Sequence, residues 1–353
     1  MEIQSRRNFL RFYNQENYQK FVPESDQDKK LPIPPLEIPY PANSILIDLI
    51  HPDNLKISQT SFLAIVNSRK SRRKFTDEYL TLEELSYLLW CTQGVKKEMR
   101  FGTFRTVPSA GARCPIETFL YIGKVKDLTP GLYRYISLQH KLLFIKTIDN
   151  PKETLSRLAY NQDFVANGAV IFIWVAVPYR TEWRYTVLSH KFIAIDLGII
   201  CENLYLACEA RDLGTVAIGY YEQENLDYLL ELNSKEYFSV LIAPVGKIPH
   251  KFELQNFFST QKTEVTIETL KKYLGMYEIP NGPQVNVILE KDHLIITSDI
   301  FQEFLKPHSE TEFIGGEMLR AVRMILDEKG SVIKMVVLPG LISDKDIIEL
   351  IKK

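Results

Sequence analysis

The densest run of positive charge in the chain is the segment RKSRRKF at residues 69–75. Five of its first six residues are cations, whereas the whole chain balances 43 Lys+Arg against 44 Asp+Glu. Arginine forks and a hydroxyl group hold a phosphate dianion well, because bidentate charge-assisted bonds supply both energy and orientation. Arg69, Ser71 and Arg73 alternate, so an extended segment would point all three side chains the same way. A solvated basic face or a nucleic-acid patch is the alternative that this spacing leaves open.

Three further segments hold residues that could bring backbone or charge close to a ligand. In VPSAGARCP, the small residues Ser109, Ala110 and Gly111 would let a flat ligand approach the backbone. Gly219 in TVAIGYY could do the same, and Lys247 at the end of FSVLIAPVGK could add a second cation for a phosphate. The plainer alternatives are a tight turn, a β-bulge glycine and a solvated lysine.

Composition favours a soluble globular protein, with 45% hydrophobic and 25% charged residues. The net charge of −1 argues against a general binder of nucleic acid or of membrane surfaces. The apolar run GAVIFIWVAVP at 168–178 is about half the length that a bilayer requires. It therefore predicts a buried strand.

No metal site or disulfide framework is expected from the cysteine and histidine spacing. Cys91, Cys114, Cys201 and Cys208 form no CxxC pair, and the six histidines form no HExxH pattern. Reduced thiols in a cytoplasmic protein are the prediction. The segment SRRNFLR at 5–11 resembles a twin-arginine signal, but the polar residues after it argue against export.

Residues 1–60 are interpreted as an N-terminal arm. Its segment LPIPPLEIPYP at 31–41 should run extended, because each proline fixes its own torsion and restricts the preceding residue. We expect the arm to lie over the main body, and a disordered leader is the alternative.

The segment TLEELSYLLWCTQG predicts the first helix of the body. Thr81 and Glu84 form a capping box, the leucines that follow fall on one face, and Gly94 is placed to end the helix. The alternating run IETFLYIGKV predicts a strand, and GLYRYI predicts its hairpin partner.

The longest helical pattern covers residues 187–212. Ile193, Leu197, Ile200, Leu204 and Ala207 line one face, and much of the remaining surface is also apolar. Such a helix is buried, either centrally or in an oligomer. Gly214 is expected to end it, after which the sequence predicts a short strand in TVAIGYY, a helix in QENLDYLLEL and a strand in FSVLIAPVGK.

The C-terminal part has a different character from residue 284 onward. QVNVILEKDHLIITS and MILDEKGSVIKMVVL both predict hairpins, the second turned at Asp327–Gly330. We place a domain boundary near 255–265 and predict a small β domain over 265–353.

Taken in order, these segments resemble the nitroreductase superfamily of FMN enzymes over residues 61 to about 250. The resemblance rests on the arginine and serine segment, PSAGAR before a strand, PGLYRY, the long helix leading into LGTVAIGYY, and the final VGK. More narrowly, LTLEELSYLLWCTQGV and PSAGARCPIETFLYIGKV are similar to the branch named for the streptolysin S and thiazoline/oxazoline dehydrogenases. The resemblance implies an α+β fold, in which a mixed or antiparallel sheet is flanked by helices around a long buried helix. The implied domains are the arm at 1–60, an FMN-binding domain at 61–255, and the small β domain at 265–353.

The resemblance also implies site residues. Arg69, Ser71 and Arg73 match the segment that holds the FMN phosphate and ribityl chain, while Lys70, Arg72 and Lys74 should be more exposed. The loop against the isoalloxazine would be Pro108, Ser109, Ala110 and Gly111. Gly219 would lie near the reactive edge of the flavin, and Lys247 would contact the phosphate. NAD(P)H is the implied co-substrate, and a homodimer with FMN at its interface is the implied assembly.

One departure bears on the reaction. Azoline-forming relatives share a Lys-Tyr pair, and the comparable place here holds Arg184 and Tyr185. Arginine stays protonated and cannot act as a base, which argues against azoline oxidation. Arg184 is predicted to contact the cofactor. Tyr185 is a candidate general acid, and Tyr221 is a second candidate proton donor. The branch often has histidine at the position of Cys114.

Residues 265–340 resemble the small β-rich domain that follows the catalytic part of β-lactamase-like serine hydrolases. This resemblance implies an accessory module and not hydrolase chemistry. The expected function is that of an FMN-dependent oxidoreductase with ping-pong chemistry on a small-molecule or peptide-derived substrate, with no nucleic-acid or membrane partner. The alternatives are an azoline-type dehydrogenase acting on a modified peptide and a catalytically silent flavin-binding scaffold.

Overall fold

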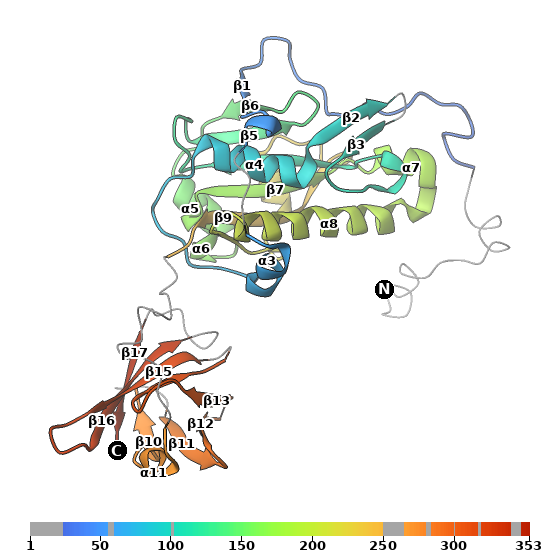
Figure 1. The fold of residues 1–353 in the computed structure, drawn as a ribbon. Coiled ribbons are helices and arrows are strands. Elements are labelled where there is room, and N and C mark those ends of the chain that lie inside the picture. The colour runs from blue at the N-terminus through green and yellow to red at the C-terminus, as the bar shows by residue number, and fades with distance from the viewer. Residues whose placement is uncertain are drawn as a thin grey trace. The chain divides into compact units, whose positions relative to one another are not determined.

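The computed structural model describes residues 24–55, 60–99, 102–249, 265–279, 284–299, 301–316, 319–339 and 347–353. The chain divides into two compact units, Met1–Pro249 and His250–Lys353, which are considered separately below (Figure 1). The boundary predicted near 255–265 falls almost entirely outside the described residues.

A seven-stranded sheet forms the centre of the first unit. The strand order is β1-β6-β5-β4-β7-β9-β8, and every neighbouring pair is antiparallel. The strands are β1 (Leu46–Asp48), β4 (Ile116–Ile122), β5 (Gly131–Ile136), β6 (Lys141–Lys146), β7 (Val170–Ala176), β8 (Leu213–Thr215) and β9 (Phe238–Lys247). Strand β7 is buried at every position, because β4 and β9 flank it and helices cover both faces. The buried strand predicted from the apolar run at 168–178 is therefore confirmed.

Helices cover the two faces of this sheet. On one face lie α4 (Leu82–Gln93) and α8 (Ser189–Glu209), whose apolar side chains share a cluster with Phe172 and Trp174 of β7. On the other face lie α5 (Pro151–Leu158), α6 (Asp163–Asn167) and α9 (Gln223–Leu229), packed with Ile171 and Ile173. Successive residues of β7 thus serve opposite layers, as the alternation of a strand requires.

Helix α4 begins and ends as the sequence predicts. Thr81 Oγ1 accepts from the Glu84 backbone N–H at 3.1 Å, and the Glu84 carboxylate accepts from the Thr81 N–H at 2.9 Å. Gly94 is the C-cap. A reciprocal cap of this kind stabilises a helix by about 1 kcal/mol.

Helix α8 is the long helix expected from the sequence, and the described residues leave part of its surface exposed. Ile193, Ile200 and Leu204 are buried against the sheet, whereas Ile195 is 47% exposed. Figure 1 shows α8 running along the sheet beside α4.

The predicted end of this helix at Gly214 is wrong, because α8 ends at Glu209 and Gly214 lies within β8. A Cβ added at Gly214 would lie 2.5 Å from Ile248 Cγ2 and 2.9 Å from Arg72 Cβ. The missing side chain lets the segment around Arg72 pack directly on β8.

Several short elements escaped sequence-based prediction. They are α3 (Phe62–Ser68), α7 (Tyr179–Tyr185), the hairpin β2 (Val95–Met99) with β3 (Gly102–Arg105), and the 3-10 turns η2 (Pro52–Asn54) and η4 (Thr186–Leu188). The 3-10 turn η3 (Ala110–Ala112) is the tight turn that the sequence left open as an alternative.

The described part of the arm lies across the body and is fixed by polar contacts. The backbone N–H of Ile38 donates to Glu117 Oε1 at 3.0 Å, and Arg134 donates to the Ile38 carbonyl at 2.8 Å. The Glu37 carboxylate accepts from Ser137 Oγ and from the Leu138 N–H, both at 2.9 Å. From residue 24 to residue 50 the arm is therefore part of the packed structure.

The second unit is a closed barrel of eight antiparallel strands, so the predicted small β domain is confirmed. Pairing of the first strand with the last, Tyr277 opposite Lys352, closes it. The strands are β10 (Gly275–Glu278), β11 (Gln284–Glu290), β12 (His293–Thr297), β13 (Gln302–Pro307), β14 (Glu312–Ile314), β15 (Leu319–Leu326), β16 (Val332–Pro339) and β17 (Ile348–Lys352).

Both predicted hairpins are present in the barrel. Strands β11 and β12 form the first, and β15 and β16 form the second, whose turn has Gly330 at φ +80°. The short helix α11 (Ile267–Lys271) adds Leu270 to the apolar interior. Among the described residues of the whole chain, no helix is both long and apolar enough to cross a membrane.

Candidate functional site

The cationic segment 69–76 follows α3 and runs beside the β8 edge of the sheet. The Arg72 N–H donates to the Thr215 carbonyl at 2.9 Å, and the Thr76 N–H donates to the Lys247 carbonyl at 2.9 Å. These two bonds hold the segment without helix or strand structure.

Tyr205 of α8 gathers two of the three predicted phosphate-binding side chains. Ser71 Oγ lies 3.1 Å from Tyr205 Oη, and the guanidinium carbon of Arg69 lies 5.4 Å from the centroid of the tyrosine ring. Ser71 is exposed and Arg69 is half-buried, so both remain accessible beside α8.

Arg73 does not join this pair. Its guanidinium carbon lies 5.9 Å from the ring centroid of Phe164 in α6, which packs on the opposite face of the sheet from α8. The expectation that Arg69, Ser71 and Arg73 all point the same way is therefore wrong for Arg73.

The expectation that Arg72 is more exposed than its neighbours is also wrong. Its Nε and Nη2 donate to the two carboxylate oxygens of Glu209, both at 2.9 Å, and the two side chains are only 12% and 4% exposed. This bidentate pair ties the cationic segment to the end of α8. Lys70 and Lys74 are exposed, as expected.

Lys247 is ion-paired with Glu84, the same residue that caps α4. The lysine side chain is 25% exposed. The predicted phosphate contact is thus already engaged by a carboxylate, and an incoming phosphate would have to share or displace it.

A carboxylate on α8 holds the loop at 107–115. Ser109 Oγ donates to Asp196 Oδ2 at 2.6 Å, and the Ala110 N–H donates to Asp196 Oδ1 at 3.2 Å. Ser109 Oγ also accepts from the Cys114 N–H at 2.8 Å. Burial raises the pKa of the Asp196 carboxyl, and the two hydrogen bonds that it accepts oppose this rise. Pro108 is exposed at the start of the loop.

The other side of this loop faces the end of α7. Gly111 has φ +59°, and a Cβ added there would lie 2.6 Å from Tyr185 Oη and 3.2 Å from Arg184 Cδ. Arg184 is exposed, with its guanidinium carbon 5.5 Å from the Tyr185 ring centroid. The structure therefore brings together the predicted loop residues, Arg184 and Tyr185.

Gly219 and Tyr221 have contrasting surroundings although they are close in sequence. Gly219 is exposed, and an added Cβ would meet only Leu241 Cδ1, at 3.9 Å. Tyr221 is 7% exposed within the apolar cluster beneath α9, and burial raises its pKa to about 12. Gly219 leaves room for a ligand, whereas the burial of Tyr221 disfavours its predicted role as a proton donor.

Within one chain the predicted residues form two groups along α8. The first contacts α8 at Asp196 and the second at Tyr205, nine positions apart, which is about 13 Å at the helical rise of 1.5 Å per residue. Three residues that organise these groups, Asp196, Tyr205 and Glu209, were not predicted from the sequence. Polar residues in an otherwise apolar helical pattern are the signal that could have identified them.

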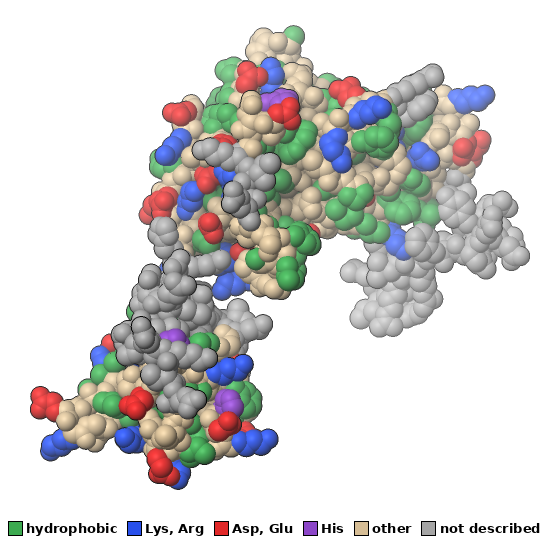
Figure 2. Space-filling view, viewed as in Figure 1, with side chains coloured by type: hydrophobic (Ala, Val, Ile, Leu, Met, Phe, Trp, Pro, Cys, Tyr) green, Lys and Arg blue, Asp and Glu red, His purple; other side chains and the backbone are tan. Residues whose placement is uncertain are grey.

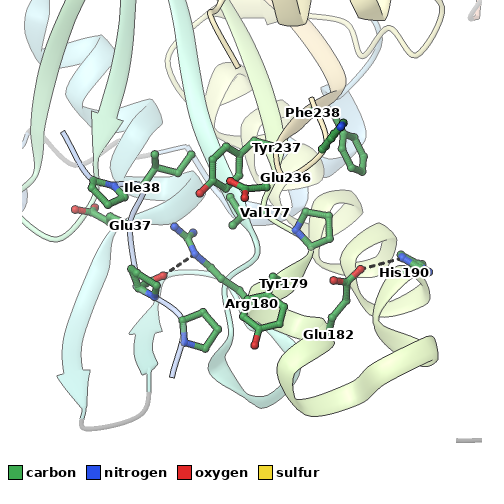
Figure 3. A pocket seen from close by; sticks show the side chains of 15 residues that line it. Glu37, Ile38, Val177, Tyr179, Arg180, Glu182, His190, Glu236, Tyr237 and Phe238 are labelled. Carbon is green, nitrogen blue, oxygen red and sulfur yellow. Dashed lines mark hydrogen bonds and ion pairs between the residues drawn. The ribbon is translucent and has the colours of Figure 1, made fainter. Parts of the chain in front are cut away.

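A cavity of about 500 Å³ lies beneath the arm (Figure 3). Arg180, 2% exposed, donates from its three nitrogens to the Pro35 carbonyl at 2.9 Å, the Cys114 carbonyl at 3.2 Å and Glu117 Oε1 at 2.6 Å. One guanidinium thus joins the arm, strand β4 and the end of the 107–115 loop. No predicted site residue lines this cavity.

The described residues contain no group of three or more His, Cys, Asp or Glu side chains arranged to hold a metal ion. The four cysteines are free thiols.

Comparison with known proteins identifies the class. The model of the nitroreductase family matches residues 66–247, which is more than half of the chain. The chain therefore belongs to the nitroreductase family, whose members are oxidoreductases. A Methanocaldococcus jannaschii protein named "Putative nitroreductase MJ1384" is 32% identical over 183 residues, covering 52% of this chain and 89% of that protein.

Solved structures were also compared. A crystal structure of a "putative nitroreductase" from Ralstonia eutropha JMP134 has a TM-score of 0.49 and 28% identity, covering 62% of this chain and 99% of its own. The E. coli microcin synthetase McbBCD complex with truncated pro-MccB17 has a TM-score of 0.44 and 16% identity, covering 69% and 86%. The NADPH:FMN oxidoreductase of Vibrio harveyi, in complex with NAD+, has a TM-score of 0.38 and 17% identity, covering 60% and 82%.

Proposed function

We propose that the protein is an FMN-dependent oxidoreductase that uses NAD(P)H and a small-molecule or peptide-derived substrate in turn. The observation that carries this proposal is the gathering of the Arg69 guanidinium and the Ser71 hydroxyl on Tyr205, at an accessible edge of a nitroreductase-family body. A cation and a hydroxyl held side by side suit a phosphate monoester.

The residues fit FMN in two further respects. Residues 109–111 carry only small side chains, and the open space at Gly219 lets a planar ring approach the backbone. Arg69 and Ser71 would hold the phosphate, and the backbone at Gly111 and Gly219 would face the ring. When bound, FMN supplies two-electron redox chemistry between the nicotinamide and the acceptor.

The side chains of this protein have distinct tasks in the proposal. Arg69 and Ser71 neutralise and orient the phosphate. Arg73, whose guanidinium lies near Phe164 of α6, is separate from this pair. Tyr185, packed against Gly111 and Arg184, is the candidate to donate a proton to the reduced substrate. Arg184 beside it stays charged, which favours an electron-rich group nearby.

We propose a homodimer with the cofactor at its interface. Exposed apolar side chains gather on α3 and on the outer face of α8, with Phe62 and Leu63 each 70% exposed and Ile195 47% exposed (Figure 2). A two-fold contact through this surface would cover it. Such pairing would also bring the residues around Asp196 in one chain to the residues around Tyr205 in its partner. Within one chain these two groups lie too far apart along α8 to form a single site.

The narrower alternative, an azoline-type dehydrogenase on a modified peptide, is disfavoured because Arg184 occupies the place of the lysine. A catalytically silent flavin-binding scaffold would bind FMN yet reduce no acceptor. Turnover with NAD(P)H and a panel of electron-poor acceptors separates a scaffold from an enzyme.

The first test is the visible spectrum of the purified protein. We expect flavin absorption from the wild type, release of FMN on denaturation, and loss of the colour in Arg69→Ala/Arg73→Ala. Arg157→Ala, which removes an arginine that is 58% exposed on α5, is the matched control and should stay yellow. A wild type that is colourless and takes up no added FMN would contradict the proposal.

A further inference from the structure

We infer that Tyr205 is a positioning residue for the anion-binding group, because its hydroxyl fixes Ser71 as a hydrogen-bond donor toward the ligand. This inference rests on the proposed FMN function and goes beyond it by identifying how the phosphate contact is oriented. Tyr205 lies in α8 and is not among the site residues predicted from the sequence.

The hydrogen bond between Ser71 and Tyr205 can run in either direction, and the other partner of the phenol favours donation by Tyr205. The backbone N–H of Ala217 donates to Tyr205 Oη at 2.8 Å, and an amide N–H can only donate. The tyrosine oxygen is therefore an acceptor in that bond, and its own proton is available for a different partner. Ser71 Oγ, at 3.1 Å, is the acceptor that the described contacts place there.

This direction has a consequence for Ser71. An oxygen that accepts from Tyr205 keeps its own hydroxyl proton, and Ser71 is exposed, so that proton points to an incoming ligand. Each hydrogen bond in the series from the Ala217 N–H through Tyr205 to Ser71 is therefore donated in the same direction, toward the ligand. Hydrogen bonds aligned in this way polarise one another and favour an anion at the end.

The ring of Tyr205 has a separate role from its hydroxyl. Arg69 stacks over the ring, with its guanidinium carbon 5.4 Å from the centroid, and a cation in this position is attracted to the ring face. One side chain thus places both the cation and the hydroxyl. Because Ala217 lies two residues before Gly219, Tyr205 also links the phosphate-binding residues Arg69 and Ser71 to the segment predicted to face the flavin ring.

The alternative is that Tyr205 has only a structural role, in which its hydroxyl accepts the hydrogen bond of the Ala217 N–H. The two readings differ in what the Tyr205→Phe variant does to phosphate recognition. This variant keeps the ring beneath Arg69 and removes only the hydroxyl.

The experiment compares the dissociation constants of FMN and riboflavin, which lacks the phosphate, by titrating the flavin-depleted protein. We expect Tyr205→Phe to weaken FMN binding about tenfold, as loss of a hydrogen bond to a charged group implies, and to leave riboflavin binding unchanged. Ser71→Ala should give the same selective loss. Combining Tyr205→Phe with Ser71→Ala should weaken FMN binding no more than either substitution alone, since both interrupt the same hydrogen-bond relay from Ala217 through Tyr205 to Ser71. Tyr228→Phe, on a side chain that is 85% exposed, is the matched control.

Each remaining outcome decides a different point. Equal weakening of both flavins in Tyr205→Phe would assign Tyr205 a structural duty and overturn the inference, as would unchanged affinity for FMN. Unimpaired riboflavin binding shows that a variant is folded. Should Tyr205→Phe fail to fold, Ser71→Ala at its exposed position decides: retained preference for FMN over riboflavin overturns the relay. Absence of FMN binding by the wild type defeats the proposed function itself, and the inference with it.

Discussion

Ser109 of the 107–115 loop donates its hydroxyl to the Asp196 carboxylate of α8 at 2.6 Å, and Asp196 is only 4% exposed. The contact joins residues 87 positions apart in sequence. The serine oxygen also accepts from the Cys114 N–H, so one hydroxyl closes the loop on itself and fixes it to the helix.

Removing this hydroxyl should destabilise the fold and loosen the loop. Ser109→Ala leaves a buried carboxylate oxygen and the Cys114 N–H without their partner, which predicts a loss of about 1–3 kcal/mol in the free energy of unfolding. Urea denaturation measures it. Ser234→Ala, at an exposed position, is the control and should change stability by less than about 0.5 kcal/mol. Equal effects of the two substitutions would contradict the assigned contact.

The buried pair between Arg72 and Glu209 should be far more sensitive than an exposed pair. Arg72→Met leaves the Glu209 carboxylate, 4% exposed, without its cation, and breaking such a pair costs about 3–5 kcal/mol. The exposed pair of Arg157 with Glu222 gives the comparison, since Arg157→Met should cost no more than about 1 kcal/mol. Chemical denaturation of both variants checks the difference. A loss below about 1 kcal/mol for Arg72→Met would mean that the pair is not formed in solution.

Two glycines of the candidate site should respond differently to alanine. Gly111→Ala places a Cβ 2.6 Å from Tyr185 Oη on a backbone at φ +59°, so we expect a loss of about 1–2 kcal/mol. At Gly219 the nearest atom is 3.9 Å away, so Gly219→Ala should leave stability nearly unchanged. If a flavin ring packs there, Gly219→Ala should still weaken FMN binding. Thermal unfolding and FMN titration of both variants separate the two effects.

The contacts of His140 predict a loss of stability in mild acid. Burial lowers the pKa of His140, whose Nδ1 lies 2.7 Å from Tyr135 Oη and whose Nε2 lies 3.0 Å from the Ile50 carbonyl. The carbonyl can only accept, so Nε2 carries the proton and Nδ1 accepts from Tyr135 in the neutral ring. The folded pKa lies below the unfolded value of about 6.5, so this contribution is complete above that pH. It is lost progressively as the pH falls from there toward the folded pKa.

Unfolding free energies measured at about pH 7.5 and about pH 5.5 test this point. The decrease in the wild type should exceed that in His140→Phe, which cannot titrate. A His140→Phe variant with the full wild-type decrease would assign the acid sensitivity to other groups.

Local signals made much of the fold predictable from the sequence. The capping box at Thr81 and Glu84, the apolar run that forms β7 and the turn at Gly330 depend on neighbouring residues, and all three are confirmed. The direction of Arg73 and the burial of Arg72 were mispredicted, because each depends on a partner far away in the chain. Nothing near Arg72 in sequence indicates that Glu209, 137 positions later, will neutralise it.

The same limit applies to the candidate site. Small residues identified the loop at 109–111, but the carboxylate that holds it lies in another element. Helix α3, only seven residues long, was missed because so short a helix gives little periodic signal. Alternation predicted one common direction for the cationic segment, whereas bonds to Thr215 and Lys247 set its actual course.

The buried guanidiniums of Arg180 and Arg134 bear on how much of this chain is needed to make a stable protein. Arg180 donates a hydrogen bond to the Pro35 carbonyl of the arm, and Arg134 donates one to the Ile38 carbonyl. Both acceptors lie about thirty residues before the family match begins at 66. Cutting the chain at the edge of that match would expose two charges that the native fold has removed from water. The segment that matches the family model is therefore shorter than the segment that must fold together here.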